Sequence, residues 1–153
     1  MTSRRDRIRM TDEEVATFLD GRLVMNVASL GHDGRPHLVA MWYGFLDGAP
    51  AFWTYAKSQK MVNLRRDPRV TCLVEDGDTY AELRGVELVG TGTIIEDRDA
   101  VMAIGRSVMD RYTGPYTDEM APLLEAAGAK RAAVRIDVER TVSWDHRKLE
   151  GGY

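Results

Sequence analysis

The chain has 153 residues, of which 44% are hydrophobic and 29% charged, values typical of a globular protein with one sizeable core. Its formal net charge of −3 argues against nucleic acid as a partner, because proteins that bind the phosphate backbone usually carry a clear basic excess. The single cysteine, Cys72, excludes an intrachain disulfide, and no segment approaches the roughly 20 apolar residues of a membrane-spanning helix.

The N-terminal segment is basic, and no apolar signal core follows it. We therefore expect residues 1–10 to be a flexible leader and the protein to be cytoplasmic. A helix is predicted next, because Thr11 is a good N-cap, acidic residues fill the first turn and Gly21 is a suitable end.

Apolar runs separated by glycine and Asp-Gly turns predict β-structure over the following part of the chain. The predicted strands lie at residues 22–30, 35–46, 49–56, 69–76 and 79–96. Cys72 in the fourth of these is interpreted as a small buried apolar residue. The last strand is long, and Gly85, Gly90 and Gly92 indicate bends or bulges in it. Residues 58–67, between the third and fourth strands, predict a short helix that ends before Pro68.

The pattern changes after residue 96. Helices are predicted over residues 97–114 and 117–128, and β-structure returns over residues 130–149. The total is six or seven strands with flanking helices, for which an antiparallel barrel is the economical arrangement, since closure removes exposed edges. We predict one mainly β domain of the α+β class over residues 11–149, followed by a tail at 150–153.

Polar and basic side chains follow the third predicted strand directly. Lys57, Ser58, Gln59 and Lys60 stand at the start of the short helix, and two of the chain's four lysines fall here. A helix start offers unpaired N–H groups and the positive end of the helix dipole. A phosphate site is one interpretation of this stretch, and a solvated helix start is the other.

Two further groups of side chains could serve a ligand. The pairs Trp42–Tyr43 and Trp53–Tyr55 lie on neighbouring predicted strands, where a planar ligand or an ordinary core would fit equally. The closing "SWDHRKL" (143–149) crowds large specific side chains that could line a site or an interface.

No motif for metal or hydrolytic chemistry is present. The histidines His32, His37 and His146 have no metal-binding spacing, and no nucleophile elbow, Walker loop or dinucleotide fingerprint occurs. An enzyme of this sequence would depend on a bound cofactor for its chemistry.

Four segments resemble the flavin-binding split β-barrel family, the pyridoxamine-phosphate-oxidase-like fold. They are "LGHDGRPHLVAMWY", "FWTYAKSQKMVNLRRDPRV", "ELRGVELVGTGTI" and "SWDHRKL", and the resemblance covers about Asp12 to Leu149. Within the family, "HDGRP", "NLRRDPR" and "SWDHRKL" are similar to the actinobacterial branch that uses the deazaflavin coenzyme F420. The resemblance implies a homodimer with two cofactor sites at the subunit interface, and hydride transfer between F420 and a conjugated small molecule.

The resemblance also implies how the cofactor would be held. Lys60 would pair with the cofactor phosphate, helped by Ser58, Gln59 and Lys57. In that family the third strand leads into a short helix, and the residues at the junction hold the phosphate.

The neighbouring strands would hold the rest of the cofactor. Trp53 and Thr54 would run along the polyol chain and ring edge, and Met41 and Trp42 would face the ring with backbone groups. Gly85 stands where the oxidase branch has glutamine, which weakens the case for a true pyridoxamine phosphate oxidase.

The closing segment would complete the pocket from the partner subunit, through Trp144, His146 and Arg147. The candidates for an acid that supplies the accompanying proton are His37, Tyr43, Tyr112 and His146.

Three alternatives stay open at this point. The first is an FMN-binding flavoprotein of the same fold, and the second a non-enzymatic flavin- or F420-binding protein. The third, a haem-handling split barrel, is less favoured because none of the histidines has an axial-ligand context. Quinones, bilins, nitro compounds and unsaturated lactones are all conceivable electron acceptors.

Overall fold

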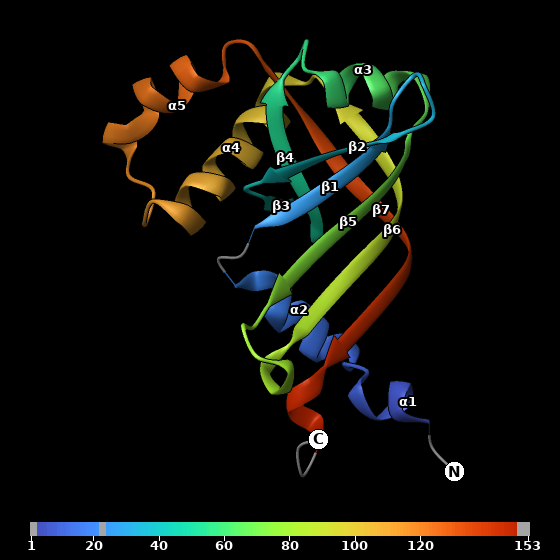
Figure 1. Ribbon diagram of the computed structural model, residues 1–153. Coiled ribbons are helices and arrows are strands. Elements are labelled where there is room, and N and C mark those ends of the chain that lie inside the picture. The colour runs from blue at the N-terminus through green and yellow to red at the C-terminus, as the bar shows by residue number, and fades with distance from the viewer. Residues whose placement is uncertain (1–2, 22–23, 150–153) are drawn as a thin grey trace.

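The computed structural model describes residues 3–21 and 24–149 (Figure 1), so the predicted tail at 150–153 lies outside the described residues. The helices are α1 (Arg4–Ile8), α2 (Asp12–Asp20), α3 (Gln59–Arg66), α4 (Arg98–Tyr112) and α5 (Ala121–Gly128). The strands are β1 (Met25–Leu30), β2 (Pro36–Met41), β3 (Gly44–Leu46), β4 (Ala49–Tyr55), β5 (Arg69–Asp76), β6 (Arg84–Ile95) and β7 (Arg131–Asp145). Short 3-10 turns are η1 (Tyr80–Glu82), η2 (Asp118–Met120) and η3 (His146–Lys148).

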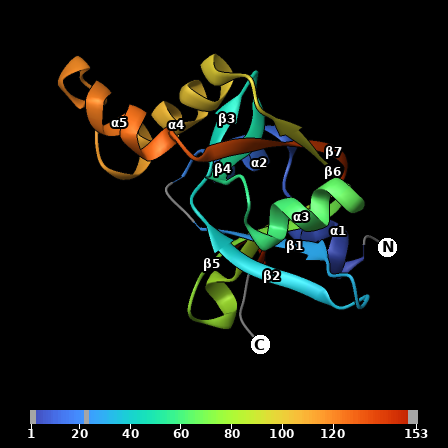
Figure 2. The ribbon, with the colours of Figure 1, turned by 90° about the horizontal axis from the view of Figure 1, so that it is seen from above.

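All seven strands form one antiparallel sheet in the order β2-β1-β5-β6-β7-β4-β3. The view from above shows the sheet curving round a central space, with β2 on one side and β3 and β4 on the other (Figure 2). This arrangement is a half-barrel with five flanking helices, so the predicted antiparallel fold of six to seven strands with helices is confirmed.

The strand predicted over residues 35–46 is wrong in one respect, because it is broken into β2 and β3. Trp42 and Tyr43 connect the two pieces and carry the chain from one edge of the sheet to the other. The apolar pattern runs on through the break, so the sequence gives no turn signal there. The bend brings Gly44 so close to α4 that a β-carbon at this position would lie 2.5 Å from the Ser107 hydroxyl oxygen.

The strand predicted over residues 79–96 begins only at Arg84, because Tyr80–Glu82 form a 3-10 turn, and the helix predicted over 117–128 is divided into η2 and α5. Local signals set several other boundaries close to their predicted places. At the start of α2, the Thr11 hydroxyl accepts a hydrogen bond from the Glu14 N–H, and the Glu14 carboxylate accepts one from the Thr11 N–H at 2.7 Å. This reciprocal pair satisfies two backbone donors that a helix start otherwise leaves unpaired. The register between β6 and β7 shifts at Val89 and Gly90, but there Val89 pairs with Arg140 and Gly90 with Val138. The extra residue is Glu139, so the bulge lies in β7 and not in the long strand where it is predicted.

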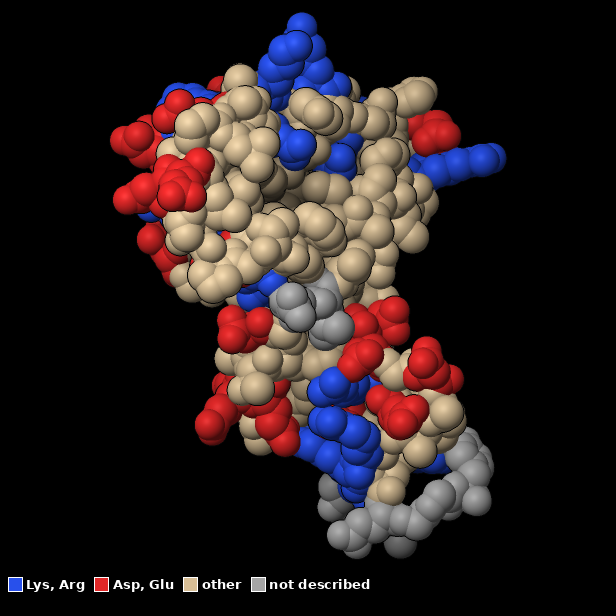
Figure 3. Space-filling view, turned by 90° about the vertical axis from the view of Figure 1, so that its left-hand side faces the viewer, with Lys and Arg blue, Asp and Glu red and all other residues tan. Residues whose placement is uncertain are grey.

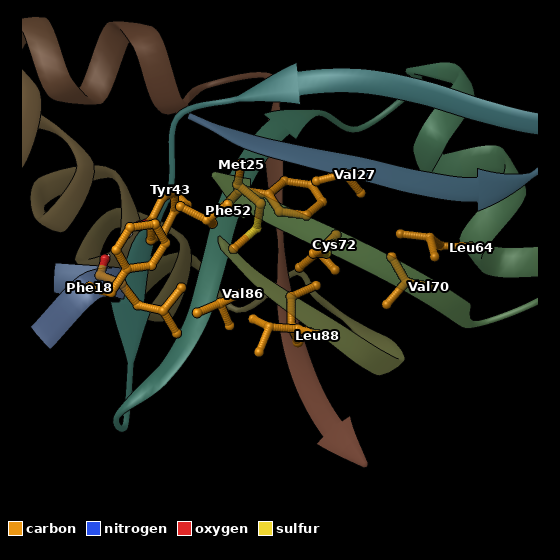
Figure 4. Packing of buried hydrophobic residues seen from close by; sticks show 14 of the residues in the cluster. Phe18, Met25, Val27, Tyr43, Phe52, Leu64, Val70, Cys72, Val86 and Leu88 are labelled. Atoms are coloured by element: carbon orange, nitrogen blue, oxygen red, sulfur yellow. Dashed lines mark hydrogen bonds between the residues drawn. The ribbon is translucent and has the colours of Figure 1, made fainter. Parts of the chain in front are cut away.

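The larger of two apolar clusters fills the concave side of the sheet. Its buried members include Phe18, Met25, Val27, Tyr43, Phe52, Leu64, Val70, Cys72, Val86 and Leu88 (Figure 4). Burying each large side chain contributes about 1.5–3 kcal/mol, so this cluster is the main source of stability. Cys72 lies within it, as predicted, and burial raises the pKa of its thiol to about 12.

The second cluster lies on the other face of β4 and β7, under α4 and α5. Its buried members are Ala51, Trp53, Val101, Ile104, Val108, Leu124 and Ala133. Because side chains alternate along a strand, Phe52 enters the first cluster and Trp53 enters the second.

The N-terminal segment is attached to the far end of β7. The Met10 N–H donates to the Ser143 hydroxyl at 3.1 Å, and the Lys148 ammonium donates to the Arg9 carbonyl at 2.8 Å. None of the described helices is long and apolar enough to cross a membrane.

Candidate functional site

The junction between β4 and α3 holds a half-buried ammonium group. The Lys60 Nζ donates to the Thr54 hydroxyl oxygen at 3.1 Å, and Thr54 is itself buried. Ser58 is the N-cap of α3, but its hydroxyl makes no capping hydrogen bond and lies 3.5 Å from the Thr54 hydroxyl oxygen. Two hydroxyls and one ammonium group therefore converge at the start of the helix.

A second cation, Arg131, lies beside this junction. Arg131 is the cross-strand partner of Tyr55, and its guanidinium carbon lies 4.7 Å from the Tyr55 ring centre and 4.9 Å from that of Trp53. Its Nε donates to the Ala127 carbonyl at 2.9 Å, which fixes the head group in place. Burial, and then the positive charge of Arg131, lowers the pKa of Lys60.

Among the described residues, no carboxylate oxygen forms an ion pair, at a distance of 4.0 Å or less, with a charged nitrogen of Lys57, Lys60 or Arg131. Two neighbouring positive charges in a partly desolvated place are unfavourable unless an anion compensates them. On the face drawn in Figure 3, basic side chains gather at a hollow in the upper part of the molecule, the end where α3 lies, and acidic ones lie away from it. The junction is suited to bind an anion.

Other cations on α3 already have partners within the protein. Arg65 pairs with Glu96 at 3.4 Å and donates to the Ala56 carbonyl at 3.0 Å. Arg66 donates to the Leu30 carbonyl. These two arginines are therefore less available to a ligand than Lys60.

Gln59 contributes to holding α3 in place. Its amide nitrogen donates to the Asn63 side-chain oxygen at 2.8 Å, and the fully buried Asn63 donates to the Ser29 hydroxyl at 3.1 Å. This chain of hydrogen bonds ties the helix start to β1. In the described chain, the Gln59 amide thus points along the helix toward Asn63.

The edge of β4 is open beside the junction. The ladder between β3 and β4 ends at Ala51, so no described strand pairs with residues 52–55 on that side. Unpaired N–H and C=O groups on a strand edge are available to an extended ligand. The Trp53 indole is not available to a ligand, because it is buried against Gly105 of α4 and Gly128 of α5.

Met41 and Trp42 lie where β2 ends. Met41 is partly buried against the larger cluster, whereas 52% of Trp42 remains exposed. The Trp42 ring stacks on Tyr112 of α4, with 4.7 Å between ring centres and 7° between planes.

A second group of expected site residues lies together at the other end of the sheet. Gly85 and Trp144 are cross-strand partners, and a β-carbon at Gly85 would lie 2.3 Å from the Trp144 ring. The His146 Nδ1 lies 2.8 Å from the Tyr80 carbonyl oxygen. Arg147 pairs with the buried Asp145 at 2.6 Å, and this pairing lowers the pKa of that carboxyl group.

The two groups do not meet within one chain. On β7, Ala132 lies opposite Thr54 and Trp144 lies opposite Gly85, so twelve residues of strand separate them. At about 3.3 Å per residue this amounts to as much as about 40 Å. In Figure 1 the α3 end is at the top and η3 is at the bottom.

The four candidate proton donors differ in their surroundings. The Tyr43 hydroxyl is buried and donates to the Leu19 carbonyl, and burial raises its pKa to about 12, so it is a poor acid. The Tyr112 oxygen accepts a hydrogen bond from the Tyr43 N–H at 3.5 Å. The His146 Nδ1 is engaged by Tyr80, whereas the buried His37 Nδ1 has no hydrogen-bond partner among the described residues. Tyr43 and Tyr112 are in contact, whereas His37 and His146 lie on other elements. No group of three or more metal-ligating side chains forms among the described residues.

Residues 11–145 match the family described as pyridoxamine 5'-phosphate oxidase. The chain belongs to the pyridoxamine 5'-phosphate oxidase family. This confirms the resemblance to the split β-barrel family found in the sequence.

Several solved structures share this fold. A conserved hypothetical protein, Rv2991, from Mycobacterium tuberculosis is 50% identical with a TM-score of 0.93, over 99% of this chain and 96% of that one. A protein named F420 reductase is 27% identical with a TM-score of 0.65, over 82% of this chain and 93% of its own. A putative 5-nitroimidazole antibiotic resistance protein from Bacteroides thetaiotaomicron is 15% identical with a TM-score of 0.73, covering 89% and 84%, which shows the fold alone.

Sequence reasoning about this member of the pyridoxamine 5'-phosphate oxidase family missed Arg131 and the Trp42–Tyr112 stack. Arg131 is far from Lys60 in the chain, and only the β4–β7 register brings it beside the junction. In the sequence, Arg131 is visible only as part of the basic pair Lys130–Arg131 at the start of a predicted strand, and such a pair is equally typical of a solvated strand end. Tyr112 lies on α4, and no local pattern connects that helix with the end of β2.

Proposed function

We propose that the chain is an F420-dependent reductase that acts on a conjugated small molecule. The observation that carries this proposal is the pair of cations Lys60 and Arg131, which lie near the end of β4 with no carboxylate partner among the described residues. The arrangement fits a cofactor with an anionic tail and a flat ring system.

Each part of the site would have a distinct task. Lys60, Arg131 and the hydroxyls of Thr54 and Ser58 would bind the phosphate, helped by Lys57. Backbone groups of residues 52–55, and of Met41 and Trp42, would line the polyol chain and ring. The reduced deazaflavin, when bound, supplies a hydride, and an electron-poor acceptor receives it together with a proton.

The choice of F420 over FMN rests on the F420 reductase that is 27% identical to this chain over most of its length. FMN is the second candidate, because the family is named after a flavin-dependent oxidase. The glycine at position 85, in place of the glutamine of the oxidase branch, favours the first candidate. The cytoplasmic location and the actinobacterial origin stay predictions.

We also propose that the protein is a homodimer, for two independent reasons. The convex face of β1, β2, β5 and β6 carries apolar side chains, and Leu38 on it is 65% exposed. A groove of about 350 Å³ on this face is lined largely by apolar groups, among them Ala28, Leu30 and Val89. A second copy related by two-fold symmetry would cover the same face on both chains.

The second reason is the separation of the two halves of the expected site. Trp144, His146 and Arg147 cannot reach the Lys60 junction of their own chain. In a two-fold dimer, the far end of β7 from one copy would close the junction of the other, and each dimer would hold two such sites. Gly85 would then act by leaving room for the Trp144 ring.

The test is a titration of the full-length protein with oxidised F420 and, in parallel, with FMN, by calorimetry. Wild type is compared with Lys60→Ala and Arg131→Ala, and with Arg35→Ala as the control for loss of one exposed positive charge. We expect F420 to bind more tightly than FMN, and each site variant to weaken binding by about tenfold or more, as for a hydrogen bond to a charged group. The control should bind as wild type does.

Tighter binding of FMN would move the protein to the flavin candidate. No binding of either cofactor would refute the proposed site. The dimer is tested separately by light scattering of Leu38→Glu against Leu123→Glu, a change at an equally exposed leucine on α5. Only Leu38→Glu should be monomeric. Retention of the dimer in this variant would contradict the proposed interface.

A further inference from the structure

Trp42 has an unusual position for the largest apolar side chain. It lies in the two-residue connection between β2 and β3, and 52% of it is exposed. One face of the indole is covered by Tyr112, in a nearly parallel stack at 4.7 Å. Scattered exposed apolar residues are ordinary, but a stacked and half-exposed aromatic pair offers a flat surface.

The helix α4 holds the connection in one conformation. The Ser107 hydroxyl accepts from the Phe45 N–H at 3.1 Å, and the Arg111 Nε donates to the Tyr43 carbonyl at 3.0 Å. The same guanidinium also donates to the Gly21 carbonyl at 2.8 Å, which joins α4 to the end of α2. Trp42 is therefore flanked by backbone that is fixed on its C-terminal side, and its ring is fixed by the stack.

The stack lies near the proposed ring end of the cofactor site. Gly105 of α4 contacts the Trp53 indole on β4, and Tyr112 of the same helix contacts Trp42. Seven residues of helix separate these contacts, which corresponds to about 10 Å. Trp42 also follows Met41 directly, at the end of β2 that the proposed site assigns to the ring.

We propose that the Trp42–Tyr112 stack is the platform on which the electron acceptor lies, and that the acceptor is a planar, conjugated, uncharged molecule such as a quinone. This inference rests on the proposed function, because it places the acceptor beside the cofactor ring. An indole that already stacks on one side presents an electron-rich face on the other, which favours electron-poor flat molecules. The Arg111 guanidinium lies 5.7 Å from the Tyr112 ring centre, but it donates to the carbonyls of Tyr43, Asp20 and Gly21. A ligand on the indole therefore meets a flat apolar face, which selects shape and polarisability over charge.

The experiment measures binding of menadione, a planar naphthoquinone, to the full-length protein by saturation-transfer NMR and calorimetry. It is done without cofactor and with oxidised F420, so that no turnover occurs. The variants are Trp42→Ala, Trp42→Phe and, as the control for loss of an exposed apolar side chain, Leu123→Ala. F420 affinity and the mass of the assembly are measured for each variant.

We expect Trp42→Ala to weaken menadione binding by about tenfold, which corresponds to the loss of one aromatic contact. Trp42→Phe should recover most of the affinity, and Leu123→Ala should behave as wild type. Failure of wild type to bind menadione, or equal binding by Trp42→Ala, would overturn the inference.

Two other results would also overturn it, each in favour of another role. A loss of F420 affinity as large as the loss of menadione affinity would assign the indole to the cofactor. A change of assembly mass in Trp42→Ala would assign it to the contact between copies. If wild type binds menadione through Trp42 but does not bind F420, the proposed function fails while the aromatic platform stands as a binding site.

Discussion

The Trp144 ring covers the Cα of Gly85 on the neighbouring strand so closely that a β-carbon at position 85 would lie 2.3 Å from the ring. The indole occupies the space that any side chain at position 85 would need. A glutamine there, as in the oxidase branch, is incompatible with this placement of Trp144.

Gly85→Ala should therefore displace the indole and lower the free energy of unfolding by about 1–3 kcal/mol, as overpacking of a fitted site does. The measurement is urea unfolding of Gly85→Ala, Trp144→Ala and the double variant. Since removal of the ring abolishes the clash, the double variant should be about as stable as Trp144→Ala alone. Simple addition of the two single effects would show that the clash is relieved in some other way.

Lys60 should bind anions less well as the pH rises. Burial and Arg131 lower the pKa of Lys60 in the unliganded protein, so it loses its charge earlier than an ordinary lysine. A bound anion favours the charged form, and binding at alkaline pH should therefore take up a proton. Calorimetry in buffers of different ionisation enthalpy measures this uptake, which should disappear in Lys60→Met.

The same lysine should reduce the stability of the unliganded protein. Because its pKa is lower in the folded than in the unfolded state, the folded state binds fewer protons between these two values, and stability rises with pH there. Lys60→Met should remove this dependence and raise the free energy of unfolding at neutral pH by up to about 1 kcal/mol, while it weakens anion binding. A variant that is destabilised over the whole pH range would contradict the view that the charge is uncompensated.

A mixed dimer tests whether the Lys60 junction of one copy and the Trp144 end of β7 from the other copy form one site. Lys60→Ala and Trp144→Ala should each be defective alone, but a dimer of one copy of each contains one intact site and one doubly altered site. Random mixing of equal amounts makes about half of the dimers mixed, so about a quarter of wild-type F420 sites should return. Calorimetric counting of tight sites after refolding the mixture measures this. No recovery would place both residues in the site of a single chain or outside the site.

Asp145 should make the protein sensitive to acid. The pairing with Arg147 lowers the pKa of the Asp145 carboxyl group, so its contribution is present above the unfolded pKa and is lost as the pH falls through the folded value. Asp145→Asn should cost about 1.5–3 kcal/mol at neutral pH, the value of hydrogen bonds to a charged group, and less in acid. Urea unfolding at both pH values measures this, with the exposed Asp33→Asn as the control. An equal loss at both pH values would mean that the ion pair is not its cause.

The sequence predicted those parts of the fold that local chemistry determines. The N-cap at Thr11, the apolar run of β5 and the proline after α3 placed their elements within a residue or two. The break at Trp42–Tyr43 could not be found this way, because contacts with α4, more than 60 residues along the chain, produce it.

The candidate site follows the same division. The group from Lys57 to Lys60 was visible because its members are neighbours in the chain, although Gln59 proved to bind Asn63. Arg131 depends on strand register, and the burial of the Trp53 indole depends on the glycines of two helices. Such relationships arise from tertiary packing, for which one sequence carries no local signal.

The helices α4 and α5 form one excursion of the chain between β6 and β7, and α4 carries Tyr112 of the proposed acceptor platform. The proposed anion site stands instead on β4, α3 and the first residue of β7. Substitutions confined to Tyr112 can therefore alter the proposed platform and leave Lys60, Thr54 and Ser58 in place, whereas exchange of the whole excursion would also remove the Ala127 carbonyl that holds Arg131. A family built in this way would vary its acceptors at the face of α4 that carries Tyr112, and a change there would shift the acceptor preference without loss of the proposed anion site.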